Sequence, residues 1–275
     1  MALRVHHLNC GSMCPPLAHL VNERGLLVCH CLLIEGPRGL CLVDTGMGTL
    51  DCDPRTTRIS RLFKTLVGAR LDPRETALAQ VRALGFDPAD VRDIVVTHLD
   101  LDHAGGLSDF PRARVHIDDT ELAAALKPTF RDSIRYIKAQ WAHGADWRRH
   151  KAVPGGERWF GFDRVRDIAG LGDDLLMIPL PGHSAGHAGV AVRTGDGWLL
   201  HAGDAYFHHS EITDRPHPSI PIRLIEALDD ADRTARLANQ IRLRELAGRG
   251  EVRVMSAHDP IELEQAQERA ASAAA

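Results

Sequence analysis

Four potential metal ligands, His98, Asp100, Asp102 and His103, lie within six residues, in the segment Thr97-His98-Leu99-Asp100-Leu101-Asp102-His103-Ala104-Gly105-Gly106. The preceding Ile94-Val95-Val96 is typical of a buried strand. Alternate residues of an extended segment share a face, so His98 and Asp100 can reach one point while Asp102 and His103 reach a neighbouring one. The glycines allow the backbone to turn sharply beside them. The segment therefore predicts a dinuclear metal site, with ions about 3.5–4 Å apart.

Three later segments repeat this arrangement, in which an apolar run ends in a potential ligand. The runs lead to Pro181-Gly182-His183-Ser184-Ala185-Gly186-His187, to His201-Ala202-Gly203-Asp204 and to Ser256-Ala257-His258-Asp259. Strands that end together place their last residues at one edge of a sheet, where α/β proteins usually build their sites. A single histidine near a loop is more often structural, whereas four such segments indicate one shared centre.

The ordered motifs H-x-D-x-D-H-A-G-G, P-G-H-S-x-G-H, G-D and A-H-D, preceded by Leu42-Val43-Asp44-Thr45-Gly46, resemble those of the metallo-β-lactamase-fold hydrolases. The resemblance runs from about residue 26 to 260. Within that superfamily the motifs look most like those of N-acyl-homoserine lactone lactonases and glyoxalase II-like thioesterases. The resemblance implies an α/β fold, an αββα sandwich of two mixed β-sheets flanked by helices, with two metal ions at one edge between the sheets.

The resemblance also implies a role for each motif residue. The first metal would be held by His98, Asp100 and His183, the second by Asp102, His103 and His258, and Asp204 would bridge both. Asp44 would orient a ligand imidazole. His187 is expected to be structural or to support a ligand. For His201, His208 and His209, contact with substrate or solvent near the metals stays open.

Asp100 departs from the family pattern, which has His at the second position of H-x-H-x-D-H. Two divalent ions, a bridging hydroxide and three carboxylates (Asp100, Asp102 and Asp204) would leave the centre neutral, whereas the usual His would leave one positive charge. We therefore expect a weaker attraction for anionic substrates. Zinc is the expected metal, but carboxylates also suit Mn and Fe. A centre with only one tightly held ion is an alternative.

Metal chemistry of this kind predicts hydrolysis. Water bound to the centre would be acidified to a pKa of about 7 and supply a hydroxide nucleophile, while a metal ion polarises the carbonyl. Asp102 is expected to guide the proton as well, with another ligand carboxylate as the alternative. Tyr206, two residues after Asp204, is a candidate donor to the oxyanion or the leaving alkoxide; the alternative is a packed core tyrosine. Related lactonases carry their Tyr one residue further from the Asp.

We therefore expect a metal-dependent hydrolase that opens an ester-like bond, with a lactone favoured. A glyoxalase II-type thioesterase and a phosphotriesterase are the alternatives. A catalytically inactive ligand-binding homologue is a more distant one, which the Asp100 departure would permit. Gly46-Met47-Gly48 lacks the third glycine and the helix of a dinucleotide site, so we assign it no such role.

A serine hydrolase must also be weighed. Gly182-His183-Ser184-Ala185-Gly186 is a literal G-x-S-x-G, and Asp204 and His258 follow in the order of that class. The nucleophile elbow, however, requires a helix directly after Ser184, and residues 187–192 have the pattern of a strand. A serine mechanism would also leave the segment 98–103 unexplained.

The composition and net charge of the chain argue against some classes of binding partner. The chain of 275 residues is 44% hydrophobic and 25% charged, which is ordinary for a globular protein. A net charge of −4 gives no case for nucleic acid or a membrane surface, so we expect a small-molecule substrate, with a homodimer left open. The first residues lack the apolar stretch of a secretory signal, so we expect a cytoplasmic protein. Six cysteines without C-x2-C spacing predict neither a zinc ribbon nor a disulfide framework.

Strand and helix patterns alternate along residues 1–275, which favours one α/β domain. The strands are expected at Leu26–Glu35, Gly39–Asp44, Asp93–Thr97, Arg114–Ile117, Leu175–Leu180, Gly189–Arg193, Gly197–Ala202 and Glu251–Ser256. The helices are expected at about Pro54–Gly68, Pro73–Leu84, Asp119–Leu126, Thr129–Ala142 and Arg223–Ala247. The Ala-rich end, Arg269–Ala275, is expected to fray.

The stretch from about 127 to 167 differs from the rest of the chain. It holds three of the four tryptophans, Trp141, Trp147 and Trp159, with Phe160 and Phe162 among glycines and basic residues. We expect a helical cap insertion with its own aromatic cluster. The aromatic residues either pack the cap onto the body or form a wall of the substrate pocket.

Overall fold

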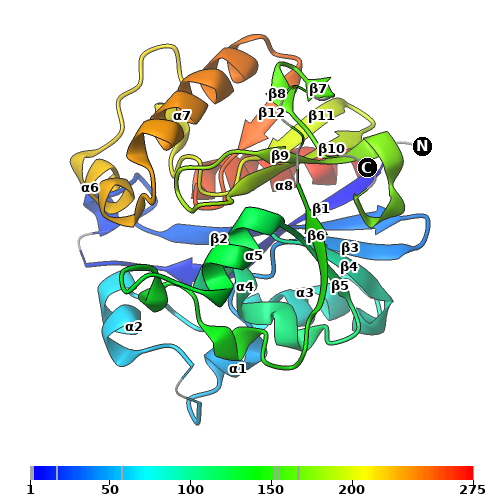
Figure 1. Cartoon of the computed structure of the whole chain (residues 1–275), viewed down its shortest axis with the longest axis vertical. Helices are drawn as coiled ribbons and strands as arrows, with labels where there is room; N and C mark the ends of the chain where they lie inside the picture. The colour runs from blue at the N-terminus through cyan, green and yellow to red at the C-terminus, as the bar shows by residue number, and fades with distance from the viewer. Residues whose placement is uncertain are drawn as a thin grey trace.

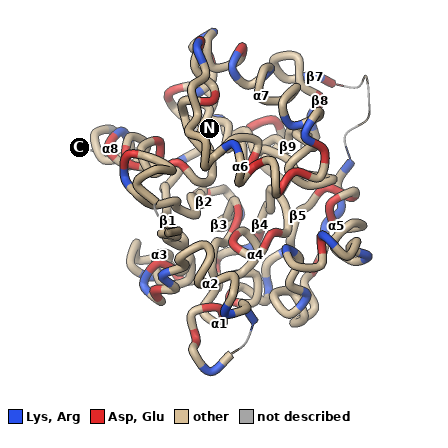
Figure 2. Tube along the Cα trace, turned by 90° about the vertical axis from the view of Figure 1, so that its left-hand side faces the viewer, with Lys and Arg blue, Asp and Glu red and all other residues tan. Residues whose placement is uncertain are grey.

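The computed structural model describes residues 3–274 apart from 17, 57, 152, 154, 156, 166 and 167. Two β-sheets lie face to face, and helices cover their outer faces (Figure 1). This is the αββα sandwich expected from the sequence. Within the described part of the chain, none of the helices has the length and apolar character needed to cross a bilayer. Lys and Arg are interspersed with Asp and Glu along the trace (Figure 2).

The first sheet has six strands in the order β1-β2-β3-β4-β5-β6. The neighbours are antiparallel from β1 to β3 and parallel from β3 to β6. The strands are β1 (Arg4–Met13), β2 (Leu27–Gly36), β3 (Gly39–Val43), β4 (Val91–Val95), β5 (Arg114–Asp118) and β6 (Asp146–His150). The two edge strands, β1 and β6, were not predicted, because neither has a continuous apolar run.

The second sheet has four strands in the order β12-β11-β10-β9, with a parallel pair at β11 and β12. Its strands are β9 (Leu175–Pro179), β10 (Ala188–Thr194), β11 (Gly197–His201) and β12 (Val252–Met255). A separate hairpin joins β7 (Arg158–Trp159) to β8 (Phe162–Asp163). Both large sheets are therefore mixed, as expected.

The core has three apolar layers, because the buried strands are apolar on both faces. Alternate residues of β2 show this: Leu32 and Ile34 pack between the sheets, whereas Leu33 packs toward the helices of the first half. The layer outside the second sheet contains Leu200 of β11 and Leu243 of α7.

The α-helices are α1 (Thr49–Cys52), α2 (Arg61–Val67), α3 (Ala77–Ala83), α4 (Leu101–Ala104), α5 (Asp119–Leu126), α6 (Ile220–Asp229), α7 (Arg233–Gly248) and α8 (Pro260–Ala274). Turns of 3-10 helix lie at Ala18–Leu20, Pro73–Glu75, Pro88–Asp90, Gly105–Asp109, Asp132–Ile134, Lys138–Gln140, Ile168–Gly170, Gly172–Asp174 and His209–Glu211. Of the expected helices, α5 has the predicted bounds.

The other helices differ from their predicted extents. The helix expected at Arg223–Ala247 is two helices, because Asp232 caps a new helix by accepting a hydrogen bond from Ala235 N. The first predicted helix shrinks to α2, which begins after a Ser60 cap. Where we expected the chain to fray, α8 remains helical to Ala274.

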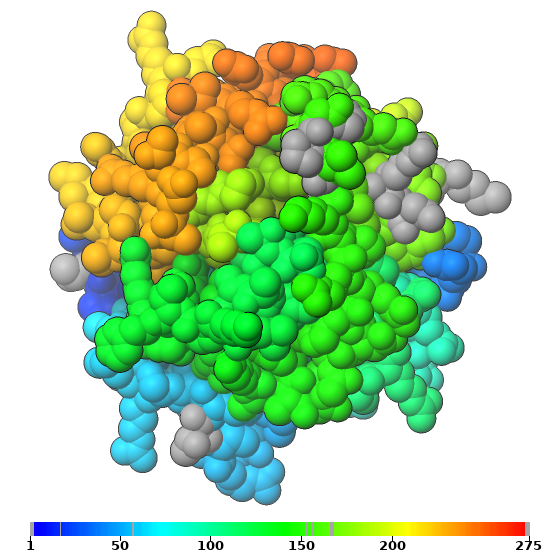
Figure 3. Space-filling view, in the orientation of Figure 1, coloured from blue at the N-terminus to red at the C-terminus, as the bar shows by residue number. Residues whose placement is uncertain are grey.

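The segment 127–167 is not a helical cap. Its described residues form two 3-10 turns, β6 and the β7–β8 hairpin, so the helix predicted at Thr129–Ala142 is wrong. Local side-chain bonds hold the turns, including one from Ser133 Oγ to Phe130 O. The aromatic residues also divide: Trp141 packs in the first outer layer and Trp159 in the second. Residues 127–150 cover much of the face shown in Figure 3, between α2 and α7.

Candidate metal centre

The seven predicted ligands come from four loops at one edge of the two sheets. His98 follows β4, and Asp100 precedes α4, which carries Asp102 and His103. The other three ligands follow strands of the second sheet: His183 follows β9, Asp204 follows β11 and His258 follows β12. His98 and Asp100 thus lie in the loop after β4, where Asp100 has an extended backbone, and Asp102 and His103 lie on the single helical turn of α4.

Three of the imidazoles have their Nδ1 atoms bound away from the centre. Nδ1 of His98 lies 2.9 Å from Thr97 Oγ1, and Nδ1 of His103 lies 2.9 Å from Asp44 Oδ2. Nδ1 of His258 donates to Val28 O at 2.7 Å. Such bonds set the ring orientation and leave Nε2 for a metal.

The first group of ligand atoms surrounds one point. Nε2 of His183 and Nε2 of His98 lie 3.1 and 3.5 Å from Asp100 Oδ2. The same two nitrogens lie 3.5 and 3.8 Å from Asp204 Oδ2. With metal–ligand bonds of about 2.1 Å, tetrahedral ligand atoms lie about 3.4 Å apart. The spacing therefore fits a cation.

The second group shares Asp204 with the first. Nε2 of His103 lies 3.2 Å from Asp204 Oδ1, and Nε2 of His258 lies 3.0 Å from Asp204 Oδ2. Asp102 Oδ2 lies 4.0 Å from His103 Nε2 and 3.7 Å from His258 Nε2. Asp204 is thus positioned to bridge two sites, as the resemblance implied.

Several of the converging atoms have no hydrogen-bond partner although they are buried. They are Nε2 of His98, Nε2 of His103 and Oδ1 of Asp204. A buried polar atom without a partner costs free energy. Imidazole and carboxylate donors that converge in this way fit divalent cations such as zinc.

The charges of the centre are strongly coupled. Burial would raise the pKa of Asp204, but His258 and His103 hold it well below its usual value. Burial likewise opposes protonation of His258, yet Asp204 raises its pKa to about 9. The pKa of His103 lies well above its usual value because of Asp204, Asp102 and Asp44, against the effect of burial. The carboxylates are therefore poised to bind cations.

Asp44 supports the centre as expected. Besides His103, its carboxylate accepts hydrogen bonds from Thr97 N at 2.7 Å and Thr97 Oγ1 at 2.8 Å. Its backbone has φ 56°, which is uncommon for a non-glycine residue and occurs often at functional sites.

The sharp turn expected at the two glycines after Ala104 is instead helical, since Gly105 has φ −57° and ψ −40°. Glycine is needed there for a close approach: a Cβ on Gly105 would lie 2.6 Å from Gly46 O. This contact holds the loop after β3 against the loop after β4.

Arg135, which the sequence analysis did not identify, contacts the ligand that departs from the family pattern. Its Nε and Nη2 donate to Asp100 Oδ1 and Oδ2 at 2.7 and 2.5 Å. Against the effect of burial, Arg135 and His98 hold the pKa of Asp100 well below its usual value. Relative to the usual His, Asp100 removes one positive charge from the centre, and the Arg135 guanidinium adds one. The neutral charge expected from the metal ligands alone therefore leaves out Arg135. The sequence around Arg135 contains no motif that predicts this pairing, because Asp100 lies 35 residues away.

Glu121 of α5 is a second residue that the sequence analysis missed. It is fully buried and accepts hydrogen bonds from Leu99 N and Tyr136 OH on one oxygen, and from Ser184 Oγ and Gly186 N on the other. It therefore ties two ligand loops together.

The same contact answers the serine alternative. Ser184 Oγ is buried and donates to Glu121 Oε2 at 2.7 Å. The segment that follows leads into strand β10, not into a helix. His258, the proposed base, contacts Asp204 and the Val28 carbonyl. Ser184 thus lacks the geometry of a nucleophile elbow.

Tyr206 is a correction. Its side chain is fully buried in the outer layer of the second sheet, and its hydroxyl donates to the Glu262 carboxylate at 2.9 and 3.0 Å. The hydroxyl is therefore committed away from the metal ligands. The next residue, Phe207, instead packs its ring on His258 and His183, at centroid distances of 4.8 and 6.1 Å.

The remaining motif histidines have structural contacts. His187 donates from Nδ1 to Leu180 O and accepts from Asp204 N on Nε2, so it supports the bridging carboxylate as expected. Nε2 of His201 contacts the His30 carbonyl. His208 and His209 face Glu23 and Asp259. These three do not point into the centre.

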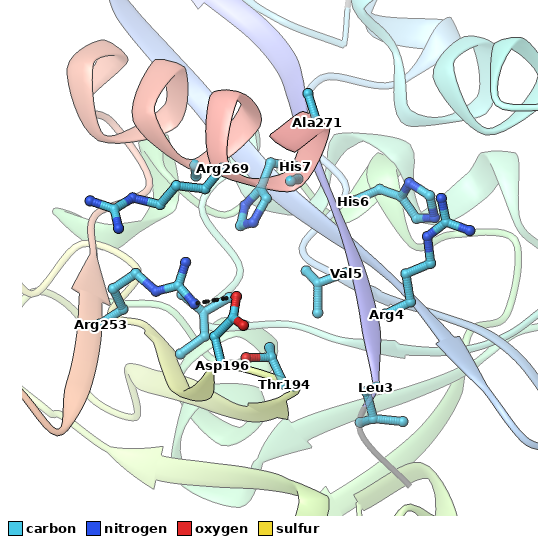
Figure 4. Close-up of a pocket in the computed structure, with 14 residues that line it drawn as sticks. Leu3, Arg4, Val5, His6, His7, Thr194, Asp196, Arg253, Arg269 and Ala271 are labelled. Carbon is cyan, nitrogen blue, oxygen red and sulfur yellow. Dashed lines mark ion pairs between the residues drawn. The ribbon is translucent and has the colours of Figure 1, made fainter. Parts of the chain in front are cut away.

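A cavity of about 610 Å³ lies elsewhere, among β1, α8, β12 and the β10–β11 turn. Arg253 and Asp196 form an ion pair of 3.9 Å in its lining, which Figure 4 marks with a dashed line. Its lining includes none of the seven ligands. This cavity is therefore separate from the candidate metal centre.

The fold and the centre define a class: αββα proteins that hold metal between two sheets. The chain belongs to the metallo-beta-lactamase superfamily, whose family model matches residues 24–248. It is 40% identical over 263 residues to a probable metallo-hydrolase of Mycobacterium tuberculosis, covering 94% of this chain and 81% of that protein. The chain is accordingly a metallo-hydrolase of this fold.

Two further comparisons concern lactonases. An N-acyl homoserine lactonase of Azorhizobium caulinodans is 31% identical over 191 residues, covering 68% of this chain and 65% of that protein. The solved structure of a Bacillus thuringiensis AiiA variant with N-decanoyl-L-homoserine bound has a TM-score of 0.70 at 20% identity, covering 96% of this chain and 97% of that one. The structural likeness shows the shared fold.

Proposed function

We propose that this metallo-hydrolase opens lactones. The observation that carries the proposal is the convergence of four imidazoles and three carboxylates on two adjoining points, where Nε2 of His98, Nε2 of His103 and Oδ1 of Asp204 are buried without a partner. The lactonase relative that is 31% identical supports a lactone substrate. An apolar cluster beside the centre, which includes Leu101, Met47 and Phe207, supports a substrate with an apolar acyl chain.

We further propose that the centre takes two divalent cations, with zinc as the first choice and Mn or Fe as alternatives. The first would be held by His98, Asp100 and His183, the second by Asp102, His103 and His258, with Asp204 between them. Bound cations would acidify a water and polarise the carbonyl of the substrate.

The chain's own residues supply the rest. Asp102, whose side chain is 13% exposed, is the carboxylate we assign to proton transfer: it accepts a proton from the attacking water and returns it to the leaving alkoxide oxygen. Phe207 covers the rings of His258 and His183 and limits the access of bulk water. Tyr206 has no part in this scheme.

The test is a substrate panel with the metal-reconstituted protein. We expect hydrolysis of N-acyl homoserine lactones, loss of activity on chelation and recovery with zinc, and little activity in Asp204→Asn. Asp196→Asn, on the exposed β10–β11 turn, is the matched control and should behave like the wild type.

A metal-loaded protein that leaves every lactone intact contradicts the proposal. Turnover confined to thioesters or phosphotriesters would move the assignment to one of those classes. We also propose a cytoplasmic location and a small-molecule substrate without nucleic-acid or membrane partners; the interspersed charges in Figure 2 support the absence of such partners.

A further inference from the structure

Arg135 uses all five of its N–H groups at the metal centre. Besides the two bonds to Asp100, Nη1 donates to His183 O at 3.0 Å and to Asp229 O at 3.1 Å. The fifth bond joins Nη2 to His183 Nε2 at 2.7 Å. The side chain is only 11% exposed, so these bonds form in a largely dry environment where they are strong. The residue is built into the centre and is not a surface cation.

The bond to His183 conflicts with metal binding. The Nε2 atom of a neutral imidazole has one lone pair, and a hydrogen bond from Arg135 and a bond to a cation both require it. Nε2 of His98 remains without a partner, so the guanidinium lies at the His183–Asp100 side of the first group and does not fill it. A cation can enter, but only after Nη2 releases His183.

The second group carries no such competitor. Among the described residues, the ion pairs of Asp102 and Asp204 are all with histidines. Its imidazoles are held from the Nδ1 side, at Asp44 and at the Val28 carbonyl, and each Nε2 faces Asp204, so a cation there displaces protons but no guanidinium. The two groups therefore differ in how ready they are for a cation.

We propose that Arg135 makes the two metal subsites unequal. The second subsite, of Asp102, His103, His258 and Asp204, fills first. The first subsite binds its cation more weakly, because the cation must displace Arg135 from His183 and then remain beside a positive guanidinium. Arg135 is a positioning residue that sets the affinity of the first subsite; this inference rests on the proposed metal dependence.

Arg135 also helps to hold Asp100, and its loss could therefore weaken the first subsite. Two observations favour the competing effect. Asp100 would also be held by the cation itself, because its Oδ2 lies 3.1 Å from His183 Nε2 and 3.5 Å from His98 Nε2, a spacing that one bound ion can bridge. Removal of the guanidinium also ends a like-charge contact at short range.

The test is a cobalt titration of the metal-free full-length protein, followed by its visible absorption and by elemental analysis. In the wild type we expect two classes of bound cobalt, one equivalent each. In Arg135→Gln the weaker class should tighten about tenfold or more, which is the size expected when a charge-assisted hydrogen bond stops competing. The stronger class should stay unchanged.

Two variants sharpen the test. Arg131→Gln is the matched control, because Arg131 is an exposed arginine of the same segment that donates to Leu228 O; it should titrate like the wild type. Arg135→Lys keeps the charge and guards against a folding defect in the glutamine variant. It cannot form the two-pronged contact with Asp100, and the first subsite should tighten less than in Arg135→Gln.

Equal affinity of both equivalents in the wild type would overturn the inference. The inference would also be overturned if the weaker class of cobalt bound with unchanged or lower affinity in Arg135→Gln while that variant kept a native near-ultraviolet circular dichroism spectrum. These readouts do not depend on hydrolysis. Protein that binds cobalt as described but cleaves no lactone would therefore refute the proposed function alone, whereas protein that binds no cobalt would refute both.

Discussion

An imidazole can bind a metal through either ring nitrogen, and a hydrogen bond at one nitrogen leaves the other one for the metal. In His98, His103 and His258 a hydrogen bond at Nδ1 fixes the ring and exposes Nε2. His183 differs, because its Nδ1 is buried without a partner and its Nε2 contacts Arg135. The four histidines therefore share a motif role but differ in how firmly they are set.

Protonation of His258 gives a prediction at this scale. Its pKa is raised to about 9 in the metal-free protein, above the usual 6.5, so it is largely protonated at pH 7.5. A cation needs the neutral ring. We expect metal binding at pH 7.5 to release protons, and affinity to rise between pH 7 and 9. Calorimetric titration in two buffers of different ionisation enthalpy measures the release.

The same shift affects stability in the opposite direction. The His258–Asp204 pair stabilises the metal-free fold fully below about pH 6.5, and this contribution disappears as the pH rises through about 9.

The control for the proton-release experiment is His19→Gln, which changes an exposed histidine and should release the same number of protons on metal binding as the wild type. Metal affinity that stays constant from pH 7 to 9 would contradict the assignment of His258 as a protonated ligand.

At the scale of the elements, α5 joins the two ligand loops through Glu121. A Cβ on Gly186 would lie 2.1 Å from Glu121 N, so the loop after β9 can approach the helix only with glycine at that position. The bounds of α5 were predictable, because Asp118 caps it locally by accepting from Thr120 N. The hydrogen bonds of Glu121 to the two ligand loops were not predictable, since its partners lie 15 to 65 residues away in the sequence.

Glu121→Gln tests this junction. Four donors meet the carboxylate, and an amide can accept from one oxygen only, so two buried donors lose their acceptor. We expect a loss of about 2–4 kcal/mol in the free energy of unfolding, measured by urea denaturation. Asp119→Asn is the control on the same helix: the side chain of Asp119 is 37% exposed and pairs with Arg149, and its change should cost under about 1 kcal/mol. Equal losses in the two variants would contradict the role of Glu121.

Across the whole molecule, the centre lies where the two sheets meet. Residues 98–103 belong to the half built on the first sheet, whereas His183, Asp204 and His258 follow strands of the second. A cation bound between them would link the two halves, whose sheets lie face to face in Figure 1. Binding to the folded state alone should therefore stabilise the entire fold.

Metal removal measures that link. Zinc at a thousandfold excess over its dissociation constant adds about 4 kcal/mol, which for a chain of this size raises the melting temperature by about 10 °C. Differential scanning calorimetry of metal-free and zinc-loaded protein checks this. Asp204→Asn should lose most of the shift. If the wild type melts at the same temperature in both states, the centre is not filled.

The sequence alone predicted the fold and the side chains that converge at the sheet edge, because most of them follow buried apolar runs and such runs pack as sheet strands whose ends meet at one edge. It did not determine what else reaches that edge. Arg135, Glu121 and Phe207 arrive there through contacts between segments far apart in the chain, and Tyr206 turns instead toward Glu262. Only the tertiary structure decides such contacts, because packing and burial between distant segments leave no local pattern. The sequence showed Asp100 only as a residue that replaces the family's histidine, whereas the tertiary structure shows that it pairs with Arg135.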